Sequence, residues 1–416
     1  MTIAVKEVRE SWKTPAVMGS VAVIIFVFFG LVGKPEDVSF QLSSSKELIQ
    51  LEPLVIASNF LGTVVGVLLL MITALAALLV YRNKRVSIWY SMLFGALSLV
   101  ALLGWLAGGN TVPLAFILGS ALVLAVPIML GAMAGVMSER VGVVNIAIEG
   151  QLLTGAFMAA VVSTITGNQI VGLVSAMITA ALFSMVLAVF SVRYLAQQII
   201  VGVVLNVLAI GITNFFYQQF LTQDSAGTNS PGTLPIISIP FLSQIPVIGP
   251  ALFENRITVY LAVLIVIMVW FILFKTKLGL RARAVGEHPL AADTVGINVG
   301  RTRFWWVTLG GLLAGLGGAT LTIGNAGAFG REMSGGLGFI ALAVVILGRW
   351  HPIYASAAAL LFGFSIILRI WANQVSPGIP TNFITMVPYL VTLIAVVGFV
   401  GRSRPPAADG IPYVKG

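Results

Sequence analysis

One short stretch of the sequence places a carboxylate, two amides and several apolar residues side by side. It reads GVVNIAIEGQ over residues 142–151 and contains Asn145, Glu149 and Gln151. An ionisable side chain near the centre of a membrane costs at least about 2.5 kcal/mol, so it generally faces a partner or a watery path. Two roles follow for Glu149. It lines a polar path, or it is structural, either as an ion pair with Arg140 or at an interfacial depth.

Three asparagines elsewhere in the chain are candidates for the same path. Asn206 and Asn214 lie eight residues apart, within about 80° of one another on a helical face. Asn325 begins the stretch NAGAFGREMSGGLG (325–338), whose glycines interrupt a helix. Broken helices are tolerated where they line a cavity, and their backbone groups can bind a solute. The alternatives are interhelical hydrogen bonds for Asn206 and Asn214, and a tight turn for 325–338.

A polar loop over residues 275–303 is too long and too patterned for a simple turn, so we expect it to fold and to contact a partner. Its centre, from Glu287 through Val295, predicts a short surface helix bounded by Gly286 and Gly296. Four arginines flank this centre, and they either pair with an acidic partner or lipid headgroups or act only as topology signals. They are Arg281, Arg283, Arg301 and Arg303.

Catalytic and metal chemistry find no support in the sequence. There is no cysteine, and the two histidines, His288 and His351, fall in predicted loops. Neither a metal site nor a histidine-based nucleophile pair can be assembled from them. A phosphate-binding loop of the G-x-x-x-x-G-K-[ST] type is also missing, so we expect no ATP site, no bound cofactor and no enzyme activity in this chain.

The composition sets the environment of all these residues. Hydrophobic residues make up 58% of the chain, charged residues only 9%, and the mean hydropathy is +1.04. A soluble domain carries about a quarter charged residues, so most of this chain has lipid as its solvent. A crossing helix takes about 20 residues, so the length allows roughly ten to twelve crossings. The predicted fold class is all-α: a polytopic transmembrane protein with about 10–12 membrane segments, some short or broken.

Twelve apolar stretches are candidate segments: 16–33, 54–81, 88–107, 113–137, 143–166, 170–192, 197–220, 257–274, 304–325, 337–348, 354–371 and 383–401. The stretch 337–348 is too short to span, so it either extends back through the preceding glycines or is re-entrant. Within GGLLAGLGG (310–318), Gly311 and Gly315 have the small-xxx-small spacing of closely packed helices.

The distribution of charge predicts the topology. If the N-terminus is cytoplasmic and every segment crosses, the cytoplasmic side receives 18 of the 23 basic residues but six of the 14 acidic ones. This excess agrees with the positive-inside rule. It predicts an even number of crossings with the N-terminus and C-terminus both in the cytoplasm. The net charge of +9 then reflects topology and gives no reason to expect nucleic-acid binding.

Three stretches together resemble a known family. They are ERVGVVNIAIEGQLLTGAF (139–157), in which Ala147 stands where glycine is common, GLRARAVGEHPLAADTVGINVGR (279–301) and GGLGFIALAVVILGRWHP (335–352). They are similar to motifs in the membrane subunits of ABC importers of the ribose and branched-chain amino acid permease superfamily, in its nucleoside-type branch. The resemblance implies an N-terminal extension over 1–112 with about three segments, a permease core over 113–402 and a cytoplasmic tail over 403–416.

The resemblance also implies partners and site residues. An ATPase subunit would bind ATP and magnesium, a second permease chain would complete a heterodimer, and an extracytoplasmic binding protein or lipoprotein would deliver the solute at the cytoplasmic membrane of a prokaryote. Asn145, Glu149 and Gln151 would lie on or near the translocation path. The ATPase-coupling residues would be Arg281, Arg283, Gly286, Glu287, Pro289, Ala291, Ala292, Asp293 and Gly296.

A nucleoside or simple sugar is the solute that this resemblance implies. Within the same superfamily, the alternative is a branched-chain amino acid or autoinducer permease. Outside it, the alternative is a secondary transporter driven by an ion gradient, with Glu149 as the carboxylate that binds the coupling ion. An intramembrane enzyme is disfavoured because no convergent set of His, Asp or Cys residues is present.

Overall fold

A computed structural model describes residues 12–43, 50–375, 386 and 404–415. Ten helices in this part of the chain are long and apolar enough to cross a membrane, which confirms the predicted all-α polytopic fold. They are α1 with its π-helical end η1 (Lys13–Leu31), α2 (Ser58–Tyr81), α3 (Ile88–Ala107), α4 (Leu114–Glu139), α5 (Ile148–Thr166), α6 with η2 (Gln169–Arg193), α7 with η3 (Gln198–Leu221), α10 (Ile257–Lys275), α13 with η5 (Val299–Ala326) and α15 (Pro352–Val375).

Shorter elements connect these spans. The helices are α8 (Ser225–Thr228), α9 (Ile248–Phe253), α11 (Lys277–Glu287), α12 (Pro289–Thr294) and α14 (Leu337–Leu347). The strands are β1 (Asp37–Gln41), β2 (Leu54–Ala57), β3 (Thr111–Pro113), β4 (Ile236–Ser238) and β5 (Glu254–Arg256). β1 pairs antiparallel with β2 and parallel with β3, whereas β4 pairs antiparallel with β5. The predicted segment 383–401 lies outside the described residues, and the cytoplasmic position of both termini stays a prediction.

The chain divides into two compact units. The first takes its described residues from 1–117, 244–249 and 368–401, and the second from 118–243, 250–367 and 402–416. In the first unit, α1, α2 and α3 bury an apolar core that includes Met18, Leu69 and Phe94. The predicted limits of an N-terminal extension at 1–112 and a core at 113–402 stay predictions.

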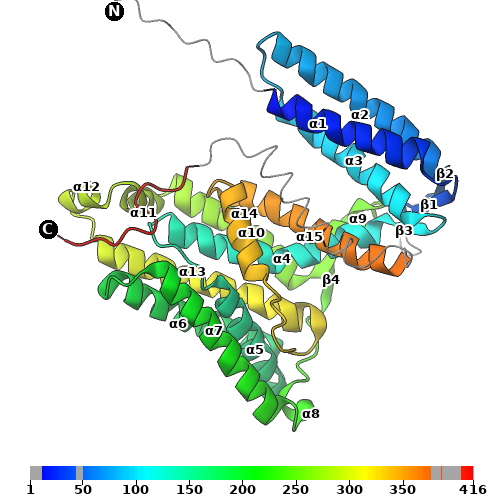
Figure 1. Ribbon diagram of the computed structural model, residues 1–416. Helices are drawn as coiled ribbons and strands as arrows, with labels where there is room; N and C mark the ends of the chain where they lie inside the picture. The colour runs from blue at the N-terminus through cyan, green and yellow to red at the C-terminus, as the bar shows by residue number, and fades with distance from the viewer. Residues whose placement is uncertain (1–11, 44–49, 376–385, 387–403, 416) are drawn as a thin grey trace, which may run out of the picture. The chain divides into compact units, whose positions relative to one another are not determined.

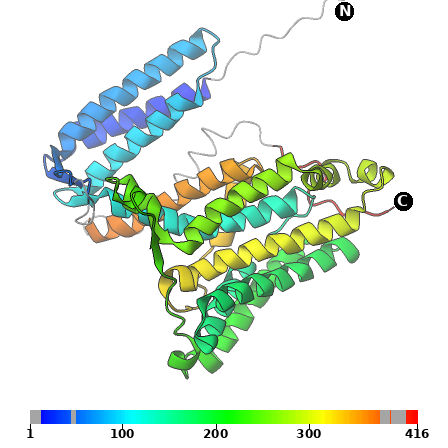
Figure 2. The same cartoon turned by 180° about the vertical axis from the view of Figure 1, so that it is seen from behind.

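Helices α5, α6 and α13 form the centre of the second unit, with α7 packed on α5 (Figures 1 and 2). Glycines allow α13 to reach the backbones of its neighbours. A Cβ added at Gly315 would lie 2.3 Å from the carbonyl oxygen of Ala176 on α6, and one at Gly318 would lie 2.1 Å from that of Leu152 on α5. Both distances are far below van der Waals contact, so these positions accept only glycine. The close packing predicted from the small-xxx-small spacing is confirmed.

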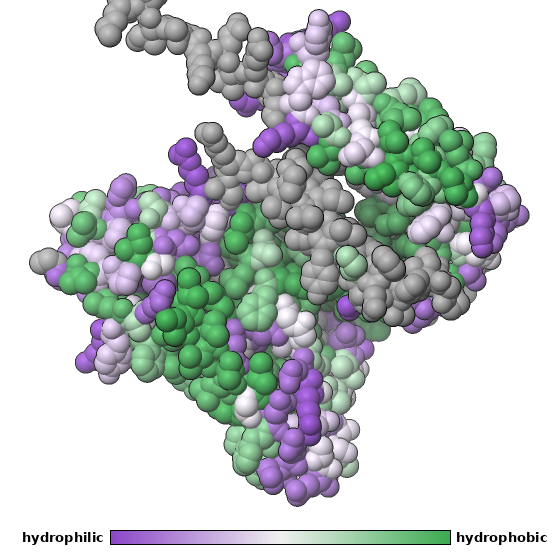
Figure 3. Space-filling view, in the orientation of Figure 1, coloured by the Kyte–Doolittle hydropathy of each residue, from purple (hydrophilic) through white to green (hydrophobic). Residues whose placement is uncertain are grey.

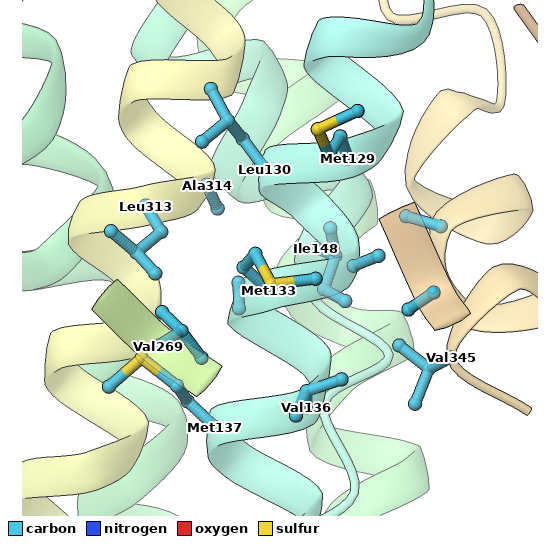
Figure 4. Close-up of a cluster of buried hydrophobic side chains, with 14 of the residues drawn as sticks. Met129, Leu130, Met133, Val136, Met137, Ile148, Val269, Leu313, Ala314 and Val345 are labelled. Atoms are coloured by element: carbon cyan, nitrogen blue, oxygen red, sulfur yellow. The ribbon is translucent and has the colours of Figure 1, made fainter. Parts of the chain in front are cut away.

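A large apolar core completes the second unit. Methionine, leucine and valine side chains of α4 meet residues of α5, α10, α13 and α14, as in the cluster around Met133, Ile148 and Val345 (Figure 4). Met133 and Ile148 are both fully buried. Since lipid tails are as apolar as these side chains, the cluster is held by close packing more than by the exclusion of water.

The apolar and polar side chains on the surface of the second unit are distributed as expected for a protein in a bilayer. Figure 3 shows hydrophobic side chains across the middle of this unit, with hydrophilic ones gathered toward α12 at one end and α8 at the other. Exposed side chains of α6, α7 and α10 include Leu182, Val207 and Leu264, which are 59%, 65% and 60% exposed. An apolar band between two polar ends is the surface expected of helices that cross lipid.

Several helix boundaries differ from those expected, including that of α2, which begins at Ser58 instead of 54 because residues 54–57 form β2. α5 begins at Ile148 instead of 143, because the chain first makes a turn after Gly142, whose φ is +85°. α13 begins at Val299 instead of 304, because the side chain of Asn298 caps it by accepting a hydrogen bond from the Arg301 amide at 2.8 Å. α14 does not extend back through the glycines, since Gly335 and Gly336 have φ values of +52° and +84°.

We predict that Gly318→Ala destabilises the protein, because the new methyl group would collide with the Leu152 carbonyl. Overpacking of this kind costs about 1–3 kcal/mol, measurable as a lower midpoint of thermal unfolding for the chain purified in detergent. Gly211→Ala on α7 is the matched control, because nothing lies within 4 Å of its added Cβ. Equal midpoints for the two variants would contradict the packing argument.

Candidate functional site

The carboxylate of Glu149 holds the N-terminus of α14. Glu149 lies in the first turn of α5 and is 6% exposed. One of its oxygens accepts hydrogen bonds from the Ser334 hydroxyl at 2.6 Å and the Gly336 amide at 2.8 Å, and the other accepts from the Gly338 amide at 2.7 Å. Amides at a helix N-terminus have no partner within the helix, and the helix dipole favours a negative charge there. The carboxylate supplies both the acceptors and the charge.

The approach of α5 to α14 requires the glycine at 338. A Cβ at Gly338 would lie 2.3 Å from the backbone nitrogen of Glu149. Arg140, considered above as an ion-pair partner of Glu149, bonds elsewhere. Its Nε donates to the carbonyl oxygen of Trp350 at 2.8 Å. Among the described residues, the contacts of Glu149 are therefore with a helix end and not with a cation.

Two amide side chains of α7 hold the turn that precedes α5. Asn206 donates from Nδ2 to the Ile146 carbonyl at 2.9 Å and accepts at Oδ1 from the Gly150 amide at 2.8 Å. Gln198 accepts from the Val144 amide at 2.7 Å. Interhelical hydrogen bonding, one of the two roles considered for Asn206, is the one that these contacts perform.

Within the turn, Asn145 and Gln151 form a reciprocal amide pair. Each donates to the side-chain oxygen of the other at 3.2 Å, and neither is exposed. Two paired amides satisfy one another where water is absent. The polar clamp is defined here as Asn145, Glu149, Gln151, Gln198 and Asn206. That members of the clamp lie on a translocation path stays a prediction.

The remaining two path candidates lie outside this group. Asn214, near the end of α7, donates from Nδ2 to the carboxylate of Glu332 at 3.2 Å. Asn325 is exposed within η5. The six predicted residues therefore separate into four that belong to the polar clamp and two that do not.

The polar loop after α10 folds into two helices, α11 and α12, and includes the short helix expected around its proline. Pro289 occupies the first turn of α12, where its missing N–H is not needed. Large apolar side chains at either end of α12 are open to solvent: Leu290 is 68% exposed and Val295 is 75% exposed. α12 therefore presents an apolar side chain at each of its ends.

Several predicted coupling residues instead face inward. Ala292 is 2% exposed, and a Cβ at Gly286 would lie 2.2 Å from the Arg140 carbonyl oxygen. The guanidinium of Arg283 lies over the ring of Phe274, 5.1 Å from its centroid. These residues position α11 and α12. The six others are exposed or partly exposed on the two helices and the turn after them: Arg281, Glu287, Pro289, Ala291, Asp293 and Gly296.

Arg303 is buried, whereas the sequence placed it in the polar loop, flanking the short helix. It lies inside α13 and is 2% exposed, because α13 begins earlier than the hydropathy indicated. Its Nη1 donates to the Ile411 carbonyl at 2.8 Å, and its Nη2 lies 3.5 Å from the Ala408 carbonyl. A buried guanidinium needs such acceptors, since an unpaired buried charge is strongly unfavourable.

The tail that supplies these acceptors also contains a buried carboxyl group. Burial raises the pKa of Asp409 to about 7, although Arg303 and the Gly410 amide oppose the shift. The carboxyl group of Glu139 lies near that of Asp409 and accepts a hydrogen bond from the indole N–H of Trp350. A cationic group, two carboxyl groups and an indole therefore meet where the tail packs against the end of α4.

In the described residues, no three His, Cys, Asp or Glu side chains are grouped so that they would hold a metal ion.

Comparison with known proteins identifies the family. The family model described as "Branched-chain amino acid transport system / permease component" matches residues 117–396. The chain belongs to this permease family. The match takes in the polar clamp, α11, α12 and α14, and it ends before the tail.

Individual relatives narrow the family to ABC transporters. Guanosine ABC transporter permease protein NupQ of Bacillus subtilis is 42% identical over 73% of this chain and 98% of its own length. Nucleoside ABC transporter permease protein NupC of Lactococcus lactis is 38% identical over 73% of this chain and 98% of its own length. The putative glucose ABC transporter permease protein TsgC13 of Haloferax volcanii is 34% identical over 62% of this chain and 78% of its own length. No solved structure matches the chain. The protein is thus an ABC transporter permease, a multi-pass protein of the cell membrane.

Sequence reasoning missed several residues on which the permease site depends. Ser334 and Gly336 were noticed only as part of a glycine-rich stretch, whereas they are ligands of the Glu149 carboxylate. Trp350 and Asp409 were not singled out. One signal was available for Trp350, because an indole between an arginine and a histidine at the end of an apolar helix commonly finds a hydrogen-bond acceptor. Nothing local marks Asp409, since its burial depends on where the tail packs.

We predict that Glu149→Gln destabilises the permease by about 1–3 kcal/mol, because an amide has one acceptor oxygen where the carboxylate uses two. The NH2 group would then face an amide donor of the α14 N-terminus. The measurement is the thermal midpoint in detergent. Glu332→Gln serves as control, since its carboxylate bonds only at the exposed end of α7. A midpoint for Glu149→Gln equal to that of the control would refute the structural role.

We predict that the tail is held more weakly at pH 8 than at pH 6. The pKa of Asp409 in the docked tail is about 7, above its ordinary 3.8, so the docked state keeps a proton that the released state loses. Docking therefore weakens as pH rises between these two values and levels off above pH 7. With these values, release becomes about tenfold more favourable from pH 6 to pH 8.

Cysteine labelling measures this release, because the chain has no native cysteine. Ala408→Cys reports opening, since Ala408 is 5% exposed, and the exposed neighbour Ala407→Cys corrects for the ionisation of the thiol. The corrected labelling rate of Ala408→Cys should rise with pH, and Asp409→Asn should remove the rise. A rate ratio that does not change with pH would rule out this role of Asp409.

Proposed function

We propose that this permease is a membrane subunit of an ABC importer for nucleosides, which moves its solute without altering it chemically. The similarity to NupQ along almost its whole length carries this proposal. The absence of a phosphate-binding loop from the sequence supports a division of labour in which a partner ATPase binds ATP and magnesium.

A simple sugar is the second candidate solute. The 34% identity with TsgC13 favours it, although the identity is lower than with either nucleoside relative and covers less of the chain. A branched-chain amino acid, the substrate in the description of the family model, is disfavoured because the relatives reported above have nucleoside or glucose names.

The partner of the permease in this proposal is a second, different permease chain. NupP, also from Bacillus subtilis, is 28% identical to this chain, and NupB, also from Lactococcus lactis, is 25% identical. In each organism a more similar and a less similar permease protein thus occur together. This pattern supports a heterodimer, completed by an ATPase and by an extracytoplasmic binding protein or lipoprotein.

The proposed contact with the ATPase is the α11–α12 surface, in the part of the chain expected to be cytoplasmic. Leu290 and Val295 supply apolar area, and Arg281, also exposed, adds a positive charge. An apolar centre with a charged rim is the composition of a specific protein interface.

Uptake into proteoliposomes that contain the permease and its partner subunits tests the function. Guanosine, glucose and leucine are added separately outside the proteoliposomes. ATP and a regenerating system are enclosed inside, on the side of the membrane where the ATPase lies. The expected result is ATP-dependent guanosine uptake that persists when an uncoupler collapses the ion gradients. Uptake that needs an ion gradient and not ATP would support the secondary transporter, and uptake of leucine alone would overturn the solute assignment.

We predict that Leu290→Asp lowers ATP-dependent uptake about tenfold, the effect of losing roughly 1.4 kcal/mol at an interface. Membrane insertion should be unchanged, because the side chain is largely exposed. Leu290→Met keeps the apolar volume and is the matched control. The Gly286 and Ala292 positions are less suitable because both are buried. If Leu290→Asp takes up solute at the wild-type rate, α12 is not part of the contact with the ATPase.

A further inference from the structure

The C-terminal segment 404–415 is bonded to the helices of the proposed ATPase contact. The Ala408 amide donates to the Gly286 carbonyl at 2.9 Å, at the end of α11, and the Ala407 amide donates to the Glu287 carboxylate at 3.2 Å. Farther along, the phenol of Tyr413 lies beside the carboxyl group of Asp293 on α12. The segment therefore touches both α11 and α12.

The same segment is bonded to the transport core. Its Ile411 carbonyl accepts from the guanidinium of Arg303 at 2.8 Å, and Arg303 lies in the first turns of α13. The ring of Tyr413 packs against the large apolar core. Figures 1 and 2 both place the segment beside α11 and the start of α13.

The fit of the segment depends on a glycine in the turn before α5. A Cβ at Gly142 would lie 2.8 Å from the Ala408 carbonyl oxygen and 2.7 Å from Nη2 of Arg303. The turn, the tail and the arginine thus occupy one tightly filled space. A shift of the tail toward Gly142 would therefore displace the turn that the polar clamp holds.

Besides the tail, α11 and α12 are held by two short connections, by Arg283 over the ring of Phe274 and by the packing of small buried side chains. A single residue, Thr276, separates α10 from α11, and residues 295–298 connect α12 to α13. The buried residues of the two helices are small ones, including Gly279, Ala282, Val285 and Ala292. Small side chains bury little area each, so the hydrogen bonds from the tail form a substantial part of the attachment.

We propose that residues 404–415 are a strap that positions α11 and α12 on the transport core, so that a displacement of α12 moves α13 and the turn before α5 instead of bending the two short helices away. The inference rests on the proposed function, because it assumes that the ATPase contacts α12. It concerns a segment beyond residues 117–396, the part matched by the family model. The strap stays docked while the importer works.

Two truncations separate a positioning role from a role in folding alone. Deleting residues 405–416 removes both carbonyl acceptors of the Arg303 guanidinium, and folding of this variant should suffer. Combining the deletion with Arg303→Met removes the stranded charge and should restore folding and assembly with the ATPase. Arg404→Ala and Lys415→Ala are the controls, because both side chains are exposed.

Coupling is measured as ATP hydrolysed per solute imported by the complete complex in proteoliposomes. If residues 404–415 act as a strap, the deletion variant with Arg303→Met should assemble but hydrolyse about tenfold more ATP per solute imported. Both controls should keep the wild-type ratio of ATP hydrolysed to solute imported. A wild-type ratio in the assembled deletion variant would overturn the proposal. Failure of the double variant to assemble would also count against it, since the tail would then be needed for folding itself.

A second measurement does not depend on transport. A spin label on Val295→Cys, the only cysteine in the chain, reports the mobility of the residue that follows α12. Mobility should increase when the tail is deleted in the variant that also carries Arg303→Met, and an unchanged spectrum would overturn the strap. If the wild-type complex shows no ATP-dependent uptake, the proposed function fails while the spectrum still tests the strap.

Discussion

The core depends on one constraint: every backbone amide inside the membrane needs a hydrogen-bond acceptor. At the start of α14, the carboxylate of Glu149 supplies the acceptors. Inside a protein surrounded by lipid, no water is at hand to satisfy an exposed amide, so an interrupted helix must find acceptors among its neighbours. α14 begins after two glycines with positive φ, and its first amides point at Glu149. The turn before α5 meets the same requirement through Asn206 and Gln198. The residues of the polar clamp are thus matched to two places where the helical ladder is broken.

The apolar architecture could be predicted from the sequence because it depends on length and hydropathy, which are local. Each segment predicted before residue 376 corresponds to a helix, and the glycines of α13 indicated close packing correctly. The start of α13 was misplaced because the Asn298 cap extends the helix into polar sequence, where hydropathy gives no signal. This extension carries Arg303 from a predicted surface into the interior.

The site was less predictable, because its contacts join residues that are far apart along the chain. Glu149 and the 142–151 stretch stood out as polar residues in an apolar segment, but the partner of Glu149 lies 185 residues away at Ser334. Asn206 was recognised as a candidate for two roles, and only the fold decides that it bonds to the Ile146 carbonyl. The sequence indicates only that the tail is a cytoplasmic end. The packing of the tail could not be predicted, because it depends on the guanidinium of Arg303, over one hundred positions earlier.

Backbone contact through glycine makes α5, α6 and α13 a single stiff block. Helices that touch at their main chains have no layer of side chains between them to deform. With 23 residues, α13 is about 34 Å long, so a tilt of ten degrees about one end displaces the other by about 6 Å. A stiff block moves as a whole, so a tilt at the α12 end of α13 reaches the opposite end of the helix at its full displacement.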